Sequence, residues 1–363
     1  MQHHYWLFAD VTNLSGNDAA NSLVILDTRG QDALTLNPKV GLPTLKKKVK
    51  DTNDSTGDTT GWQDSADHDI NDIVNFQITV TMPENLAGYK EYKVIIHDTM
   101  SAGLTLKPET IKVFAGNVDV TNSFTRAGGT DGQFTLTCDN VLGIAGVKVN
   151  KDTKFVVTYD ATLNEHAVIG SVGNPNTAYL EYSNNPYGTG TGKTTEDKVI
   201  VFTYRLIVNK VDPDGKPLQG AGFTLYKKNA EGVFVPIGEQ LVGDEMTIFQ
   251  WTGLDDGVYK LEENTVPAGY NKLADIEFTI TAEHEENSDD PTLTSLESTF
   301  GDVEVKDGTF TGNIEDDIVN NTGTVLPETG AKGTVMLIAC SSMFVMVAAV
   351  FMITRKKMSI YED

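Results

Sequence analysis

Apolar and polar positions alternate along most of the first 320 residues, in short runs separated by Gly, Asn, Asp and Pro. β-branched and aromatic residues dominate these runs, which is typical of strands that bury one face. Helical periodicity is scarce. The spacing of the runs predicts an all-β fold made of immunoglobulin-like antiparallel sandwiches. In the first half, the predicted strands are residues 74–81, 92–96, 110–115, 133–138, 154–160 and 178–182.

A second series of strands begins near residue 201. Residues 202–211 are predicted to form one strand, and the Asp-Pro-Asp-Gly sequence after it favours a turn. Two polar stretches, residues 50–69 and 283–291, are predicted to be exposed loops. The other strands predicted in this half are residues 223–227, 234–237, 247–251, 258–262 and 275–280, with residues 317–320 closing the unit.

One stretch near the C-terminus has a different pattern. Residues 334–354 contain no charged side chain. A helix of this length crosses the ~30 Å hydrocarbon core of a membrane. The basic residues Arg355, Lys356 and Lys357 follow directly, and basic flanks stay on the cytoplasmic side. The sequence therefore predicts one C-terminal transmembrane helix, with everything before it outside the cell.

The motif LPETG lies just before this stretch, at Leu326, Pro327, Glu328, Thr329 and Gly330. Motif, apolar stretch and basic tail occur in the order that resembles the cell-wall sorting signal of sortase substrates in Gram-positive bacteria. The resemblance implies cleavage between Thr329 and Gly330, with Thr329 held as a thioacyl intermediate on the sortase cysteine and then passed to an amine. The membrane would hold only the precursor, and the sorted protein would be anchored to peptidoglycan in the cell wall.

Residues 1–6 have neither the basic start nor the apolar stretch of a secretory signal peptide. Because a sortase substrate has to be exported, we expect this N-terminus to be truncated or misassigned. The two cysteines, Cys138 and Cys340, fall in a predicted strand and in the predicted membrane helix, so no disulfide framework is expected. An exported β-rich protein without disulfides needs another kind of reinforcement.

The formal net charge of -23 argues against binding to nucleic acid, because phosphates require a basic surface. Such acidity is mostly a sign of solubility at an exposed surface. Calcium binding by the acidic loops is an open alternative, but Asp and Asn in loops are more often turn residues. We therefore predict no metal site and no cofactor.

The second unit resembles a known family along most of its length. Residues 206–212 and 220–226 are similar to the start of a collagen-adhesin B-type domain of Gram-positive pilins, and residues 259–270 resemble the pilin E-box. The first unit resembles the middle domain of backbone pilins at residues 43–49, 97–104 and 176–184. The predicted organisation is an N-terminal pilin-domain remnant and linker (1–40), a middle pilin sandwich (41–200), a collagen-adhesin B-type sandwich (201–325) and the sorting signal (326–363).

In these families, a lysine on the first strand and an asparagine on the last join in an internal amide with loss of ammonia, assisted by a carboxylic acid. Lysine must be neutral to attack, and burial favours its neutral form. The acid must be protonated to polarise the asparagine carbonyl, and burial also raises the pKa of a carboxyl group. An apolar core therefore activates both partners.

Strand alternation indicates which residues take these roles. In residues 45–49, Lys47 shares the inward face with Leu45 and Val49, and Asn176 lies on an inward face later in the unit. Asp98, which follows the apolar residues 94–96, is the predicted acid of the first unit.

In the second unit, the inward positions are Lys210 and Asn320, and the resemblance to the E-box makes Glu263 the acid. Asn321 competes with Asn320, although the register favours Asn320. Each lysine could instead be an ordinary solvated strand residue, which is the usual position of lysine. Because these reactions occur once per molecule, the protein is not predicted to be an enzyme.

The resemblance implies a structural pilin subunit, which a pilin-type sortase links head to tail. Its predicted partners are the sortase, identical or accessory pilin subunits and peptidoglycan, with host surface ligands left open. Residues 36–39 resemble the pilin motif, so Lys39 is the predicted acceptor of Thr329, although Asn37 replaces the common aromatic residue. A surface lysine in a linker is the alternative for Lys39. The alternative function is a non-polymerised wall-anchored adhesin or accessory pilin.

Overall fold

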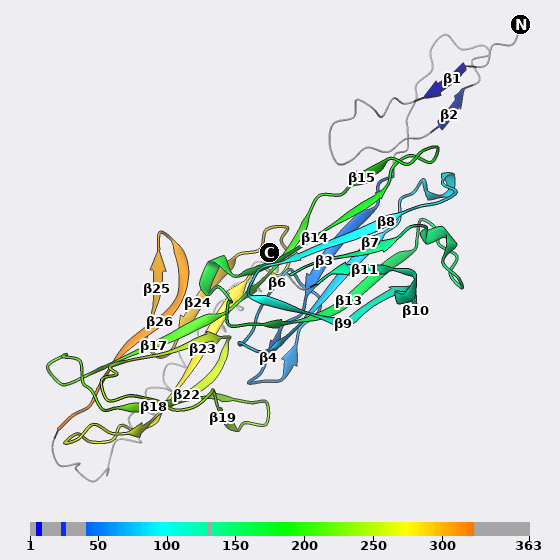
Figure 1. The fold of residues 1–363 in the computed structure, drawn as a ribbon. Helices are drawn as coiled ribbons and strands as arrows, with labels where there is room; N and C mark the ends of the chain where they lie inside the picture. Colours follow the sequence, from blue (N-terminus) through cyan, green and yellow to red (C-terminus); the bar gives the residue numbers. More distant parts are fainter. Residues whose placement is uncertain (1–4, 9–22, 27–40, 130–131, 323–363) are drawn as a thin grey trace, which may run out of the picture. The chain divides into compact units, whose positions relative to one another are not determined.

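The computed structural model describes residues 5–8, 23–26, 41–129 and 132–322, and strands make up most of them (Figure 1). The only helical elements in these ranges are four short 3-10 turns. The predicted all-β architecture is therefore confirmed. None of the helices in the described ranges is suited to crossing a membrane. The predicted transmembrane helix lies outside the described residues and stays a prediction.

The N-terminal strands β1 (Tyr5–Phe8) and β2 (Leu23–Leu26) form an antiparallel pair. A first sandwich follows, with a five-stranded sheet in the order β10-β9-β13-β7-β3. Its second sheet has seven strands, in the order β11-β12-β8-β14-β16-β6 with β15 paired to β14. The strands are β3 (Thr44–Val49), β6 (Ser65–Asp67), β7 (Ile73–Thr81), β8 (Val94–Met100), β9 (Leu104–Ala115), β10 (Val118–Asp119), β11 (Thr125–Gly128), β12 (Gln133–Cys138), β13 (Lys154–Leu163), β14 (Asn174–Ser183), β15 (Thr191–Lys193) and β16 (Asp197–Phe202), with a small β4 (Thr52–Asn53) and β5 (Asp58–Thr59) hairpin.

The second sandwich has a four-stranded sheet, β21-β17-β26-β25, and a six-stranded sheet, β19-β18-β22-β23-β24, in which β20 pairs with β18. Each sandwich has its own apolar core, built from the alternating residues that the sequence pattern predicts to face inward. The strands of the second are β17 (Tyr204–Val211), β18 (Gly222–Lys228), β19 (Phe234–Pro236), β20 (Leu241–Val242), β21 (Ile248–Leu254), β22 (Gly257–Thr265), β23 (Ile276–His284), β24 (Leu293–Ser298), β25 (Asp302–Lys306) and β26 (Thr309–Val319).

Two strand pairs are parallel, so the prediction of purely antiparallel sheets is wrong for them. β16 pairs with β6, and β26 pairs with β17. In each pair, most of a sandwich separates the two strands in sequence, which supplies the long crossover that parallel pairing requires. As a result, the first and last strands of the second sandwich are direct neighbours, with Lys210 opposite Ile318.

The predicted single strand at residues 202–211 is two strands, β16 and β17, one in each sandwich. Both are buried, so the apolar run continues across the junction. The break is at Thr203, whose hydroxyl donates a hydrogen bond to the Leu254 carbonyl at 3.0 Å.

The prediction that residues 50–69 form an exposed loop is wrong for residues 63–68, which are buried. Their polar groups are satisfied by the later loop around residue 285: the Asp64 amide donates to the Glu286 carbonyl at 2.8 Å, and Ser65 is hydrogen-bonded to His284 at 2.8 Å. A polar sequence therefore lies inside because its partners come from more than 200 residues later in the chain. The predicted loop at residues 283–291 begins two residues later, because β23 includes Glu283 and His284.

Candidate functional site

The first cluster of predicted site residues lies inside the first sandwich. Lys47 projects from β3 and is fully buried, whereas its neighbour Lys46 is exposed. Asp98 and Asn176 come from β8 and β14, which are adjacent strands of the other sheet. Both are buried, with 2% and 0% of their surface exposed. The lysine side chain therefore spans the core to reach the two residues predicted to act with it.

Hydrogen bonds join this cluster through a fourth residue, Tyr159 of β13. Lys47 Nζ donates to Asp98 Oδ2 and to the Tyr159 hydroxyl, the latter at 2.5 Å. The Tyr159 hydroxyl donates to Asp98 Oδ2 at 2.6 Å and accepts from Asn176 Nδ2 at 3.0 Å. Among the described residues, Asp98 Oδ1 and Asn176 Oδ1 are buried without a hydrogen-bond partner. Tyrosine thus holds the amine, the acid and the amide together.

The surroundings of the cluster favour neutral forms of the amine and the acid. Burial raises the pKa of Asp98, although Lys47 and Tyr159 act in the opposite direction. Burial also lowers the pKa of Lys47, against the attraction of the Asp98 carboxylate. The Lys47 amine lies 5.4 Å from the centre of the Phe76 ring and 5.2 Å from that of Tyr159, so aromatic carbon surrounds it. These are the conditions under which a lysine becomes nucleophilic.

Sequence reasoning missed Tyr159. A tyrosine on the inward face of a strand is ordinary core material, and nothing in the run at residues 154–160 distinguishes its hydroxyl. The pairing of β13 with β7, and of β7 with β3, is what places it beside Lys47.

We expect Tyr159→Phe to slow the joining of Lys47 to Asn176 by one to two orders of magnitude, because the hydroxyl that positions all three groups is lost. The measurement is the mass of the purified protein as a function of time after refolding. Tyr92→Phe, which changes another buried tyrosine of the same sandwich, is the matched control. Equal rates in the two variants would show that the Tyr159 hydroxyl has no part in the reaction.

The second cluster lies inside the second sandwich. Lys210 projects from β17, Asn320 directly follows β26, and Glu263 comes from β22 in the other sheet. The exposed fractions of their surfaces are 0%, 0% and 2%. Asn321, the competing asparagine, is exposed. The alternation of the closing strand therefore brings Asn320, and not Asn321, into the core with the lysine and the acid.

Backbone carbonyls and the acid hold this cluster in place. Lys210 Nζ donates to the carbonyls of Ile318 and Val211, at 2.7 and 3.0 Å. Asn320 Nδ2 donates to Glu263 Oε1 at 2.8 Å, and the Leu273 amide donates to Glu263 Oε2 at 2.9 Å. Burial lowers the pKa of Lys210 to about 8, although the charge of Glu263 raises it. Burial therefore shifts Lys210 toward the neutral amine that attack requires.

The two clusters differ in which strands they connect. Lys210 and Asn320 lie at the first and last strands of their sandwich, as predicted from the resemblance. In the first sandwich, Asn176 lies on β14, and β15 and β16 still follow it. The prediction of a first-to-last connection is thus wrong there, because the residues after 182, which contain Gly and Asn turns, return as a further pair of strands.

Two groups of side chains have the spacing of cation ligands. One is Asp51, Asp67 and His284, and the other is Asp54, Asp69, Asp72 and Asp255. In the larger group, the Lys227 amine lies 3.1 Å from Asp54 and 2.6 Å from Asp69, and also bonds to Asp255. An ammonium group therefore already supplies the positive charge that these carboxylates need. Nothing else in either group points to a metal ion.

Like the predicted transmembrane helix, the acceptor Lys39, the LPETG motif at residues 326–330 and Cys340 lie outside the described residues. Cys138 is buried and has a free thiol.

Comparisons with known proteins assign a family to each sandwich. Residues 70–186 match the family described as Gram-positive pilin backbone subunit 2, Cna-B-like domain, and residues 204–294 match the SpaA prealbumin-like fold domain. The trypsin-resistant surface T6 protein of Streptococcus pyogenes serotype M6 is 27% identical over 260 residues. That match covers 64% of this chain but only 44% of the relative, so the chain spans less than half of its length.

Solved structures show the same fold at lower identity. The T6 backbone pilin of serotype M6 Streptococcus pyogenes has a TM-score of 0.57 at 19% identity, covering 85% of this chain and 78% of the other. The full-length major pilin RrgB of Streptococcus pneumoniae has a TM-score of 0.52 at 16% identity, covering 86% and 80%. The two family matches, the T6 relative and the shared fold together support a Gram-positive backbone pilin.

Proposed function

We propose that this pilin is a structural subunit reinforced by two internal amide bonds, Lys47 to Asn176 and Lys210 to Asn320, and linked by a sortase into a wall-anchored fibre. The observation that carries the proposal is the presence of two separate clusters, each with a lysine, a carboxylic acid and an asparagine, all at least 98% buried. Buried lysine is rare in proteins unless it has a specific role.

The chemistry of each bond follows from the groups present. The neutral lysine amine attacks the asparagine Cγ, and the new C–N bond forms as the carbonyl becomes tetrahedral. The acid donates a hydrogen bond to the carbonyl oxygen and stabilises the charge that develops there. A proton passes from the attacking nitrogen to the amide nitrogen, the old C–N bond breaks, and ammonia leaves. The lysine amine and the asparagine amide are the only reactants, and ammonia is the only molecule released. The reaction therefore needs neither an oxidant nor a cofactor.

In the first sandwich, Asp98 suits the role of acid because, in the part of the chain that the structure describes, one of its carboxyl oxygens is hydrogen-bonded and the other is not. Oδ2 already accepts two hydrogen bonds, from Lys47 and Tyr159. Oδ1 has no partner among the described residues, nor has the Asn176 carbonyl oxygen. We propose that a proton on Oδ1 is donated to the amide oxygen, which would satisfy both of these buried atoms.

The internal bonds would change how tension passes through the protein. In the second sandwich, the bond would connect the strands at which the chain enters and leaves, so tension would pass through the amide and bypass the sheets. In the first sandwich, it would fasten the entry strand β3 to β14 in the facing sheet. A relative is named for its trypsin resistance, which is the behaviour we propose for this chain as well.

Polymerisation is proposed to join Thr329 of one subunit to Lys39 of the next, in the cell wall and outside the cell. Lys39 follows Pro38, and a proline disfavours regular strand pairing. The reaction exchanges the thioester on the sortase cysteine for an amide, so the enzyme is regenerated. The membrane helix would hold the precursor only until sorting.

Lys39→Ala and Lys39→Arg are each expected to abolish the ladder of high-mass species that the unchanged protein forms beside a pilin-type sortase. The protein is expressed with a signal peptide and an N-terminal pilin domain, and boiled in detergent before electrophoresis. Lys50→Ala, which removes a lysine of the first sandwich, is the matched control and should keep the ladder. A ladder that persists in both Lys39 variants would exclude Lys39 as the acceptor. Absence of a ladder from the unchanged protein would favour the non-polymerised adhesin.

A further inference from the structure

The edge strand β3 leaves part of its backbone open in the first sandwich. It ends the five-stranded sheet, so only one of its sides is paired, with β7. On the other side, Val49 exchanges backbone hydrogen bonds with Gln63, at 2.8 and 2.9 Å, and the Lys47 amide donates to Asp197 Oδ2 at 2.6 Å. Because amides alternate between the two edges of a strand, the amide and carbonyl of Leu45 face this same outer side.

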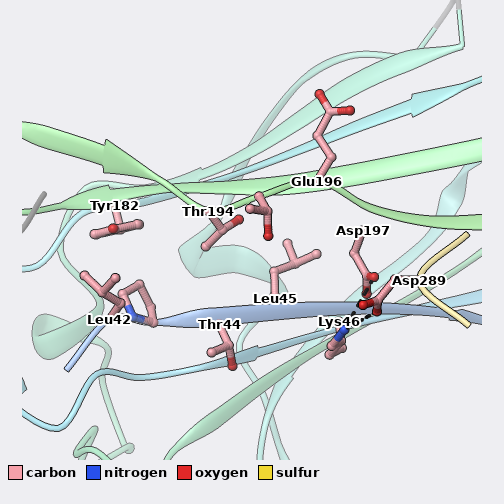
Figure 2. Close-up of a pocket in the computed structure, with 11 residues that line it drawn as sticks. Leu42, Thr44, Leu45, Lys46, Tyr182, Thr194, Glu196, Asp197 and Asp289 are labelled. Atoms are coloured by element: carbon pink, nitrogen blue, oxygen red, sulfur yellow. Dashed lines mark hydrogen bonds and ion pairs between the residues drawn. The ribbon is translucent and has the colours of Figure 1, made fainter. Parts of the chain in front are cut away.

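A cavity of about 570 Å³ lies where this edge is open (Figure 2). Within the described residues, nothing bonds to the outward backbone groups of Leu45. Leu42, Leu45 and Tyr182 form an apolar part of the lining, and Thr194 and Glu196 come from the connection between β15 and β16. An open backbone edge beside an apolar cavity is the arrangement that accepts an extended segment as an additional strand.

We propose that this cavity receives residues 323–327 of a second copy of the chain, which add a short strand to β3 beside Leu45 after the two copies have been joined. The proposal rests on the proposed function, because the bond between Lys39 and Thr329 brings the segment to the cavity. The cavity would be a docking surface for the neighbouring subunit, separate from the residues that react.

Chain lengths support this occupant. Lys39 precedes Leu42 by three residues, and Leu326 precedes Thr329 by three, so each span is at most about 10 Å when extended. A bond between Lys39 and Thr329 therefore leaves Val325 and Leu326 within reach of the cavity. Tethering at this distance raises the effective concentration of the segment to the millimolar range, so that weak backbone pairing suffices.

The chemistry of the segment also suits the cavity. Residues 323–327 carry no charge, and Thr324 and Val325 are β-branched residues that favour strands. The rim of the cavity carries Glu196, Asp197 and Asp289, with Lys46 paired to both aspartates. An acidic segment would be repelled by these carboxylates, whereas an uncharged one with an apolar side chain is accepted.

The test is hydrogen exchange at the Leu45 amide, measured in the monomer and in the covalent dimer made from the full chain by a pilin-type sortase. We expect exchange at Leu45 to be at least tenfold slower in the dimer, with no change at Val305, an exposed position on the edge strand β25. Val325→Asp lies outside the LPETG motif, so it should still form the dimer but lose this protection, and Val325→Thr should keep it. Unchanged exchange at Leu45 in a dimer that does form would overturn the docking site.

Two further outcomes separate this proposal from the proposed function. If Leu45 is already protected in the monomer, a segment of the same chain covers the edge and the proposal is wrong. If no covalent dimer forms, the polymerisation proposal fails, and docking is then measured with a synthetic peptide of residues 322–329 added to the monomer. A shift of the Leu45 amide resonance on adding the peptide supports the docking site, and no shift at millimolar peptide overturns it.

Discussion

Asp98→Ala is expected to leave Lys47 and Asn176 unjoined, and the variant should be heavier than the joined protein by one ammonia, apart from the mass of the substituted side chain. Without Asp98, the acid proposed to polarise the Asn176 carbonyl is lost, and Lys47 loses the carboxyl oxygen to which it donates. The free energy of unfolding should fall, because a crosslink between residues 47 and 176 closes a loop of about 130 residues and contributes about 5 kcal/mol on the chain-entropy model. Intact mass and urea unfolding measure the two effects.

Removing a buried acid also leaves a cavity and an unpaired lysine, which destabilises the fold by itself. Asp98→Asn separates the two causes, since it keeps the shape of the side chain but cannot donate a proton as an acid. We expect Asp98→Asn to fold and yet remain unjoined. Asp139→Ala, at an exposed aspartate of the same sandwich, should have the mass of a fully joined protein. A joined Asp98→Asn variant would show that Asp98 is not the acid.

Glu263→Ala is expected to have the same effect on the second sandwich, with a further result in proteolysis. The Glu263 carboxyl bonds to Asn320, so its loss removes both the polarising group and the contact that positions the amide. Without the bond, no covalent link holds the closing strand β26 to β17, and the pair depends on backbone pairing and on side-chain hydrogen bonds such as that from Arg205 to Asn313. Trypsin should then cut the second sandwich at least tenfold faster, while the first sandwich stays intact.

Glu262→Ala is the matched control for this variant. Glu262 is the neighbouring residue on β22, but it points away from the core toward Lys272. Its loss should change neither the mass deficit nor the rate of cleavage. If Glu263→Ala still lacks the mass of two ammonia molecules, Glu263 is not the acid. If Glu262→Ala lacks the mass of only one, Glu262 and not Glu263 is the acid.

Strand alternation was sufficient to place Lys47 and Lys210 in the core, whereas Lys227 of β18, which is also buried, was not singled out. Lys47 and Lys210 each lie in a run where every second residue is apolar, so the period of two alone placed them on the inward face. The same argument distinguished Asn320 from Asn321. Alternation does not predict which strands pair. The pairing of β8 with β14 sets Asp98 opposite Ala178, two residues along the strand from Asn176. That contact was expected from the family resemblance and not from the pattern.

The features that sequence reasoning missed depend on contacts between distant segments. The hydroxyl of Tyr159 matters because β13, β7 and β3 are neighbours, and no local signal marks it. Residues 63–68 are polar yet buried, because their partners come from the loop near residue 285. Parallel pairing of β17 with β26 was also missed, since a strand sequence carries little information on the direction of its neighbour.

The most direct test of the two internal bonds is the intact mass of the folded protein, cut after the second sandwich and compared with its sequence. We predict a deficit of two ammonia molecules, and tandem sequencing should place one in a peptide pair containing Lys47 and Asn176 and the other in a pair containing Lys210 and Asn320. A mass equal to that of the plain sequence would contradict both bonds at once.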